Sequence, residues 1–292
     1  MTPRTSTRDV LKPAAFCLVL LGLLAPTLLP AARPIAQPTT KPAAAASQAP
    51  ADAQEAGATP IRVTALSRGG KFIGTSLGGM RVVVREAATG RVLADGITHG
   101  STGDTRRIMT GEAKQAGEPL STPGSAAFET ELQLVEPTRV ILEVTGPLAQ
   151  PQAATTVTSQ WTLLPGHDYT NGDGLMVEIP GLVVDALSPP AHVKLTADTE
   201  DVDLTANVMM MCGCPIGNNP YWTPEEFEVS ATVRKDGKVI STVPLRFTGE
   251  TSQYAGTVTP DGPGAYVVSV AAFQPENGNT GVDLTSFIIE GE

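Results

Sequence analysis

The stretch that decides the fold class runs from residue 227 to residue 273 and reads FEVSATVRKDGKVISTVPLRFTGETSQYAGTVTPDGPGAYVVSVAAF. Its first part alternates apolar and polar residues with a period of two. The apolar residues on one side are Phe227, Val229, Ala231 and Val233. Because successive side chains of a strand point to opposite faces, this alternation predicts a strand with one buried face. The turn residues Lys235-Asp-Gly-Lys238 follow directly, so the segment predicts a β-hairpin.

The sequence around this hairpin predicts a complete module over residues 186–292. Similar runs, each bounded by turn residues, indicate seven strands in about 105 residues, which is the size of an immunoglobulin-like sandwich. These strands are expected near 192–197, 202–211, 227–234, 238–247, 253–258, 265–273 and 283–289.

A second module is predicted upstream, over residues 60–185. Short β-branched runs begin at Ile61 and recur at intervals of about 8–12 residues, the spacing typical of sandwiches and barrels. The expected strands lie near 80–85, 91–95, 132–135, 139–144, 159–164 and 175–179. We therefore expect an all-β chain with two immunoglobulin-like β-sandwich modules.

The N-terminal residues 1–36 resemble a secretory signal. Three basic residues precede an apolar run at residues 14–29, which is short for a membrane span. Two alternatives stay open: cleavage as a signal peptide, or retention as an N-terminal anchor. Residues 37–59 are rich in Ala and Pro and predict a linker without a core. The expected location is the periplasm or the extracellular space, with membrane tethering through residues 14–29 only if that segment is retained.

The composition and net charge exclude some classes of function. The 292 residues hold 20 Lys and Arg against 30 Asp and Glu, a net charge of −10, which becomes −13 if residues 1–36 are removed with their four basic residues and one acidic residue. This charge argues against nucleic-acid binding, which needs a basic face. No nucleophile elbow, zinc-protease helix or P-loop motif occurs, so we expect no enzyme. A binding or accessory protein remains, with another extracytoplasmic protein as the expected partner.

The most unusual chemistry lies in the segment Met209-Met-Met-Cys-Gly-Cys-Pro215. Thiolate and thioether sulfur atoms favour Cu(I), and the flexible glycine between Cys212 and Cys214 lets both sulfur atoms approach one ion. In a strand, Met209 and Met211 share a face, so we expect Met209 or Met211 to supply a thioether to a copper site with the cysteines. His99, His167 and His192 are further ligand candidates.

Other interpretations of this segment compete with the copper site. Methionine often fills irregular space in a core. Cys17 leaves with the predicted signal, so Cys212 and Cys214 could form a disulfide in an oxidising compartment. This pairing gives the alternative function, a structural or adhesive surface protein that holds no metal, while a reducible pair would allow thiol–disulfide chemistry. The adjacent Tyr221 and Trp222 predict either an aromatic contact patch or a plug at the end of the sandwich.

Two stretches resemble known modules. Residues 78–100, GGMRVVVREAATGRVLADGITHG, resemble the start of carboxypeptidase-regulatory-like modules, which repeat a strand, a Thr-Gly turn and a second strand. Residues 227–273 resemble periplasmic immunoglobulin-like modules of the YtkA and FixH type, in which a Tyr-small-Gly strand precedes a Gly-x-Tyr strand. Both resemblances imply extracytoplasmic β-sandwiches, sometimes found near copper-handling proteins, and neither implies a catalytic residue.

Overall fold

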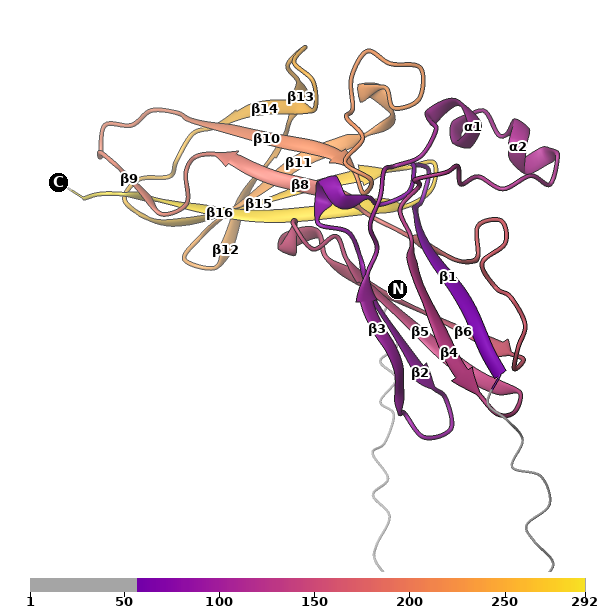
Figure 1. The fold of residues 1–292 in the computed structure, drawn as a ribbon. Coiled ribbons are helices and arrows are strands. Elements are labelled where there is room, and N and C mark those ends of the chain that lie inside the picture. The colour runs from indigo at the N-terminus through magenta and orange to yellow at the C-terminus, as the bar shows by residue number, and fades with distance from the viewer. Residues whose placement is uncertain (1–56, 292) are drawn as a thin grey trace, which may run out of the picture. The chain divides into compact units, whose positions relative to one another are not determined.

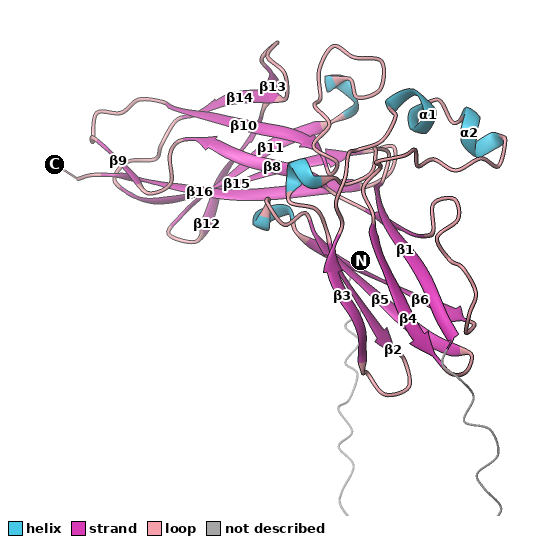
Figure 2. Ribbon diagram, viewed as in Figure 1, coloured by secondary structure: helices cyan, strands magenta, loops and turns pink. Residues whose placement is uncertain are grey.

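Residues 57–291, which the computed structural model describes, contain sixteen strands and five short helical segments (Figures 1 and 2). The strands form four sheets, arranged as two successive pairs along the chain. This confirms the prediction of an all-β chain with sandwich modules. The predicted signal or anchor at 1–36 and the predicted linker up to residue 56 lie outside the described residues.

The first pair of sheets holds β1–β7. Its three-stranded sheet has the order β4-β1-β7, and its four-stranded sheet has the order β3-β2-β5-β6. Strand β1 pairs antiparallel with β4 and parallel with β7. The strand bounds are β1 Gly57–Ser67, β2 Arg81–Glu86, β3 Val92–Ile97, β4 Phe128–Leu134, β5 Thr138–Gly146, β6 Thr155–Leu163 and β7 Leu175–Ile179.

The second pair of sheets holds β8–β16. A four-stranded sheet has the order β13-β14-β10-β8, and a five-stranded sheet has the order β12-β11-β15-β16-β9. The strand bounds are β8 Leu182–Ser188, β9 Val193–Leu195, β10 Val202–Met210, β11 Glu228–Lys235, β12 Lys238–Pro244, β13 Arg246–Phe247, β14 Gln253–Val258, β15 Gly264–Gln274 and β16 Asn279–Ile289.

Each pair of sheets closes around its own hydrophobic core. The first core includes Ile61, Val63, Val82, Leu142, Val144 and Ile179. The second includes Leu204, Val208, Val229, Val233, Val268 and Phe287. Strand β10 shows why the sequence pattern works, because every second residue from Val202 to Met210 is buried while the residues between them are more exposed. The period-two signal in the sequence therefore reflects burial on one face of each sheet.

Two strands extend across the predicted boundaries. Strand β1 begins at Gly57, so residues 57–59 of the predicted linker pair with residues 132–134 of β4. Strand β8 crosses the predicted boundary at residues 185/186 and pairs along its length with β10. The change from the first pair of sheets to the second comes at Pro180 and Gly181, between β7 and β8.

Short helices occupy the loops of the first module. They are η1 Thr75–Leu77, α1 Thr105–Met109, α2 Glu112–Gln115 and η2 Pro151–Ala153, and a further turn, η3 Pro224–Glu226, precedes β11. Helices α1 and α2 cover a small core of their own, formed by Phe72, Ile108, Ala113, Leu120 and Ala126. Asp104 caps α1 by accepting a hydrogen bond from the Arg107 backbone N–H. Within residues 57–291, no helix is long and apolar enough to cross a membrane.

Tyr254 in β14 gives a test of the second core. Its side chain is buried, and its hydroxyl has no hydrogen-bond partner within residues 57–291. Since an unsatisfied buried hydroxyl opposes folding, we expect Tyr254→Phe to raise the free energy of unfolding by about 1 kcal/mol. Chemical denaturation of both proteins at pH 7 measures this difference, and a loss of stability in the variant would contradict it.

The same residue predicts that the stability of the fold depends on pH in the alkaline range. Burial, and then the charge of Glu225, raise the pKa of Tyr254 from 10.0 to about 12. Between pH 10 and pH 12 the unfolded chain therefore releases the phenolic proton while the folded chain keeps it, so stability falls as pH rises. We expect the difference in the free energy of unfolding between Tyr254→Phe and the wild type to widen above pH 10 and to stay constant below it.

Candidate functional site

The Met-Cys segment makes a tight reversal of the chain at the end of β10. The Met210 backbone N–H donates to the Cys214 carbonyl (3.0 Å), and the Gly213 N–H donates to the Met210 carbonyl (2.8 Å). Gly213 has φ +75°, a left-handed conformation that favours glycine over residues with a Cβ. The glycine between the two cysteines is therefore what turns the chain.

This turn brings the two cysteines together. Their Sγ atoms lie 2.22 Å apart and their Cα atoms 5.4 Å apart. Cys212 is 1% exposed and Cys214 4% exposed, and both contact the core of the second module. The pair is thus shielded from solvent.

The three methionines divide between the two cores. Met210 lies in the second core with Cys212 and Cys214, whereas Met211 is buried in the first core and Met209 packs partly buried against the first core. The alternation of β10 explains the first part of this division, because Met210 follows Val208 on the inward face. The structure therefore places Met210 in the same core as the cysteine pair, and Met209 and Met211 against the core of the first module.

The histidines named as further ligand candidates lie apart from this turn in the chain and are exposed: His99, His167 and His192. Within residues 57–291, no group of three or more His, Cys, Asp or Glu side chains has the arrangement of a metal site. The set Cys212, Cys214, Met209 and Met211 stays a prediction.

Residues of the first module pack directly against the cysteine turn. A Cβ atom at Gly70, in the loop after β1, would lie 3.2 Å from Cys212 Sγ. A Cβ at Gly213 would lie 3.2 Å from the Leu77 side chain of η1. The turn at 210–214 therefore lies where the two modules meet. We call this region of contact between the modules the joint. The polar contacts described next also belong to it.

Polar side chains complete the joint, and Asn279 is one of them. Its amide Nδ2 donates to the Arg68 carbonyl (3.0 Å), and its Oδ1 accepts from the Gly181 N–H (3.0 Å). Asn279 is completely buried. A buried amide with these partners holds β16 to the loop after β1 and to the segment between β7 and β8.

The side chains of Trp222 and Gln152 also donate hydrogen bonds across the joint. Trp222 Nε1 donates to the Gly69 carbonyl (2.9 Å), and Gln152 Nε2 donates to Asp185 Oδ1 (2.5 Å). Burial raises the pKa of Asp185, which the hydrogen bond from Asn207 opposes. Trp222 is buried in the second core, while Tyr221 beside it is half-buried, with ring centroids 5.7 Å apart.

Glycine substitutions isolate the contact between the turn and the first module. Gly213→Ala would impose left-handed strain and crowd Leu77, whereas Gly237→Ala, at φ +80° with nothing within 4 Å of the added Cβ, imposes strain alone. We expect Gly237→Ala to cost about 1–2 kcal/mol and Gly213→Ala about 1–3 kcal/mol more. Equal losses in chemical denaturation would contradict the packing of Leu77 on the turn.

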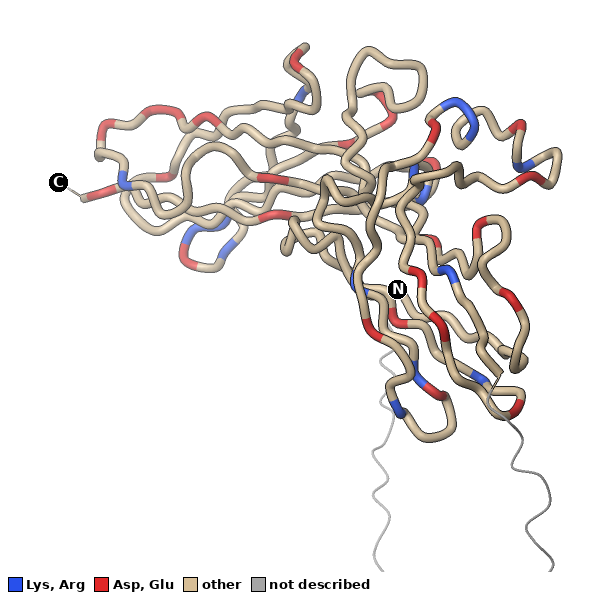
Figure 3. Tube along the Cα trace, viewed as in Figure 1, with Lys and Arg blue, Asp and Glu red and all other residues tan. Residues whose placement is uncertain are grey.

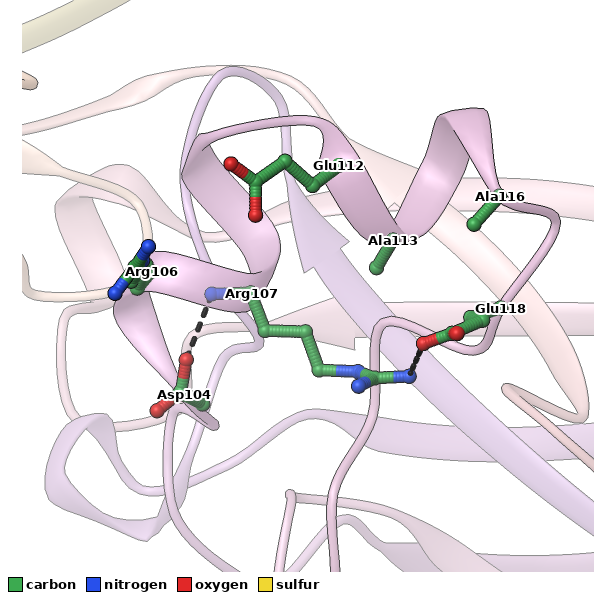
Figure 4. Close-up of a pocket in the computed structure, with 7 residues that line it drawn as sticks. All are labelled: Asp104, Arg106, Arg107, Glu112, Ala113, Ala116 and Glu118. Atoms are coloured by element: carbon green, nitrogen blue, oxygen red, sulfur yellow. Dashed lines mark hydrogen bonds and ion pairs between the residues drawn. The ribbon is translucent and has the colours of Figure 1, made fainter.

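A separate hollow of about 360 Å³ lies beside α1 and α2. Figure 4 shows Arg107 extended along it toward Glu118, with Nη2 to Oε2 at 3.0 Å. Arg107 Nε also donates to the Pro119 carbonyl (2.7 Å). Because this arginine is already paired with its neighbours, its contacts serve to hold the helical loop in place.

Comparisons with known proteins identify no family. No family model matches the sequence, and no curated protein matches it. Among solved structures, the Clostridium thermocellum CbhA fibronectin(III)-like modules are 12% identical over 82% of this chain and 92% of theirs, with a TM-score of 0.26. An engineered protein is 16% identical over 41% of this chain and 22% of its own length, with a TM-score of 0.29. The structural likeness to fibronectin(III)-like modules is thus distant, and the finer family resemblances of the sequence stay predictions.

Proposed function

We propose that this protein is an exported, non-enzymatic binding or scaffolding protein whose two sandwiches are held in a fixed arrangement by a Cys212–Cys214 disulfide at their joint. The observation that carries this proposal is the position of the cysteine pair: it is buried, and it lies against Gly70 of the other module. A covalent link there stiffens the turn that also presents Gly213 to Leu77.

The physical argument concerns the turn itself. A reduced Met210–Cys214 turn is held by two backbone hydrogen bonds, and each contributes only about 1 kcal/mol. A bond between the two sulfur atoms removes alternative conformations of a segment that both cores contact. An oxidising compartment, expected from the N-terminal segment, preserves such a bond.

A Cu(I) site competes with this proposal for the same residues. It would use the thiolates of Cys212 and Cys214 and a thioether from Met209 or Met211, which the sequence predicts, or from Met210, which shares the core with the cysteines. Copper binding needs both cysteines reduced, so the two functions exclude each other in a single molecule.

Thiol counting and copper titration separate the two functions. We expect mass spectrometry of the protein, denatured and alkylated without reductant, to find neither Cys212 nor Cys214 alkylated. We also expect the protein without reductant to bind no more Cu(I), against a competing chelator, than the Cys212→Ser/Cys214→Ser variant binds. Two alkylated cysteines would reject the disulfide, and stoichiometric copper lost in the variant would establish the competing function.

The proposed partner is another extracytoplasmic protein. Acidic side chains outnumber basic ones along β8–β16, as Figure 3 shows. Such a surface attracts proteins with basic patches and repels polyanions. Binding by a fixed pair of sandwiches also avoids the entropy loss of ordering two loose modules on a partner.

A further inference from the structure

A cavity of about 360 Å³ opens at the joint, and both modules line it. Gly69 and Met109 come from the first module, and Tyr221, Glu226 and Gln274 are among the residues that come from the second. Its volume falls in the range of small-ligand sites and suits one long side chain. The arrangement of the two modules therefore determines the shape of this cavity.

The side chain of Gln274 provides a polar atom with no hydrogen-bond partner among residues 57–291. Gln274 is 3% exposed, and its Oε1 accepts hydrogen bonds from Asn277 Nδ2 (2.9 Å) and Asn279 Nδ2 (3.1 Å). Because both of these nitrogen atoms are donors, the Gln274 amide must turn its Oε1 toward them and its Nε2 away from them. Within residues 57–291 Gln274 Nε2 makes no hydrogen bond and is not fully enclosed, and because Gln274 lines the cavity this donor is free to face it.

The orientation of Gln274 is set by the joint. Asn279 cannot turn its amide round without losing both the Gly181 N–H and the Arg68 carbonyl as partners. It therefore presents Nδ2 to Gln274, and Gln274 in turn directs a donor into the cavity. A ligand that fills this cavity must offer an acceptor to Gln274 Nε2, because a buried unpaired donor costs about 1–3 kcal/mol.

The rest of the lining favours a cation. Glu226 and Glu276 supply carboxylates, and no described residue that lines the cavity is Lys or Arg. Met109 and the Tyr221 ring supply apolar surface, and an aromatic face also attracts a cation. An ammonium or guanidinium group on an aliphatic stem matches this lining, with the charge at the carboxylates and the stem against Tyr221 and Met109.

We propose that this cavity binds a lysine or arginine side chain of a partner polypeptide, with the backbone carbonyl beside that residue accepting from Gln274 Nε2. A peptide offers both groups within one residue, whereas a free amine lacks the carbonyl acceptor. This proposal rests on the fixed joint proposed above, since residues of both modules form the cavity. It assigns the basic partner a specific point of attachment.

Nuclear magnetic resonance titration of the full-length protein tests the proposal. The probes are the peptides acetyl-Ala-Lys-Ala-amide and acetyl-Ala-Arg-Ala-amide, with acetyl-Ala-norleucine-Ala-amide as the uncharged control. The Gln274 side-chain amide signal is assigned by its loss in Gln274→Glu, which keeps the Oε1 acceptor. We expect the two basic peptides to shift this signal and the norleucine peptide to leave it in place. Equal shifts with all three peptides, or no shift, would overturn the proposal.

Charge variants identify the carboxylates that bind. We expect Glu226→Gln/Glu276→Gln to raise the Kd of the lysine peptide at least tenfold, and Glu225→Gln/Glu250→Gln, with the same change of net charge, to alter it less than twofold. Glutamine at 226 can still accept the hydrogen bond from Thr223 Oγ1, so folding is preserved. Equal effects of the two variant pairs on the Kd would show that only the net charge of the protein attracts the peptide, and would overturn the site. A neutral sugar that shifts the Gln274 amide signal and competes with the peptide would overturn it as well.

Failure of this site and failure of the fixed joint are distinguishable. If the cavity proposal fails, the peptides do not shift Gln274, while thiol counting still finds the cysteines joined. If the disulfide proposal fails, both cysteines are alkylated, while the glutamate variants still weaken peptide binding. Peptide binding by Cys212→Ser/Cys214→Ser then measures how far the disulfide supports the cavity, and we expect a loss of threefold or more.

Discussion

Asn279→Leu is expected to lower the free energy of unfolding by about 4 kcal/mol. The substitution leaves the Gly181 N–H and the Arg68 carbonyl without their partner and removes one donor to Gln274 Oε1. Each orphaned buried group costs about 1–3 kcal/mol. Because leucine has as many side-chain heavy atoms as asparagine, the substitution leaves no cavity and these losses dominate the result. Urea denaturation followed by circular dichroism measures the change.

The same substitution should also uncouple the two modules. Each module has its own hydrophobic core, and Asn279 connects β16 of the second to the loop after β1 of the first. We expect one calorimetric transition in the wild type and two in Asn279→Leu. The exposed Asn171, in the loop between β6 and β7 of the first module, provides the control as Asn171→Leu. A loss in Asn279→Leu below about 1 kcal/mol, with one transition, would contradict this role.

The strands that the sequence predicted best are those with one buried face. In β11, the four residues that define the sequence pattern are all buried: Phe227 at its entry, then Val229, Ala231 and Val233. The hairpin turn at residues 235–238 joins β11 to β12 as expected. Local pattern and tertiary burial agree in these elements, so alternation alone was sufficient.

The strand ends near the linker and the joint depended on information that the local sequence lacks. Gly57-Ala-Thr-Pro60 has the composition of the linker before it, and it becomes a strand because β4 pairs with it. In β8, Leu182, Val183 and Val184 are all buried, so the strand shows no alternation where it begins. A strand covered on both faces gives no period-two signal.

The candidate site was predicted in part, for similar reasons. The Cys-Gly-Cys spacing indicated a close sulfur pair, because a glycine between two cysteines permits a tight turn, and the pair is close in the structure. Which methionine faces that pair depends on how β10 is packed between two cores. The joint itself could not be predicted from the local sequence, because its contacts join residues far apart in the chain. Asn279 and Arg68 are separated by 211 residues, and Trp222 and Gly69 by 153.

Trp222→Ala is expected to cost about 3–5 kcal/mol, because it removes a large buried side chain from the second core and leaves a cavity. It also leaves the Gly69 carbonyl without the indole N–H. Trp222→Phe separates these two effects, since phenylalanine keeps most of the apolar volume but donates no hydrogen bond. We expect it to lose about 1–2 kcal/mol, of which about 1 kcal/mol reflects the missing bond across the joint.

The neighbouring residue provides the matched control. Tyr221 contacts Trp222 and is half-buried, and its hydroxyl makes no hydrogen bond within residues 57–291, so Tyr221→Phe should change the free energy of unfolding by less than about 0.5 kcal/mol. Since Tyr221 lines the cavity, Tyr221→Ala should weaken binding of the lysine peptide while leaving the joint intact. Trp222→Ala should weaken both stability and binding, because it removes the anchor that holds this loop against Gly69. A Trp222→Ala protein with wild-type stability would show that the aromatic pair does not anchor the joint.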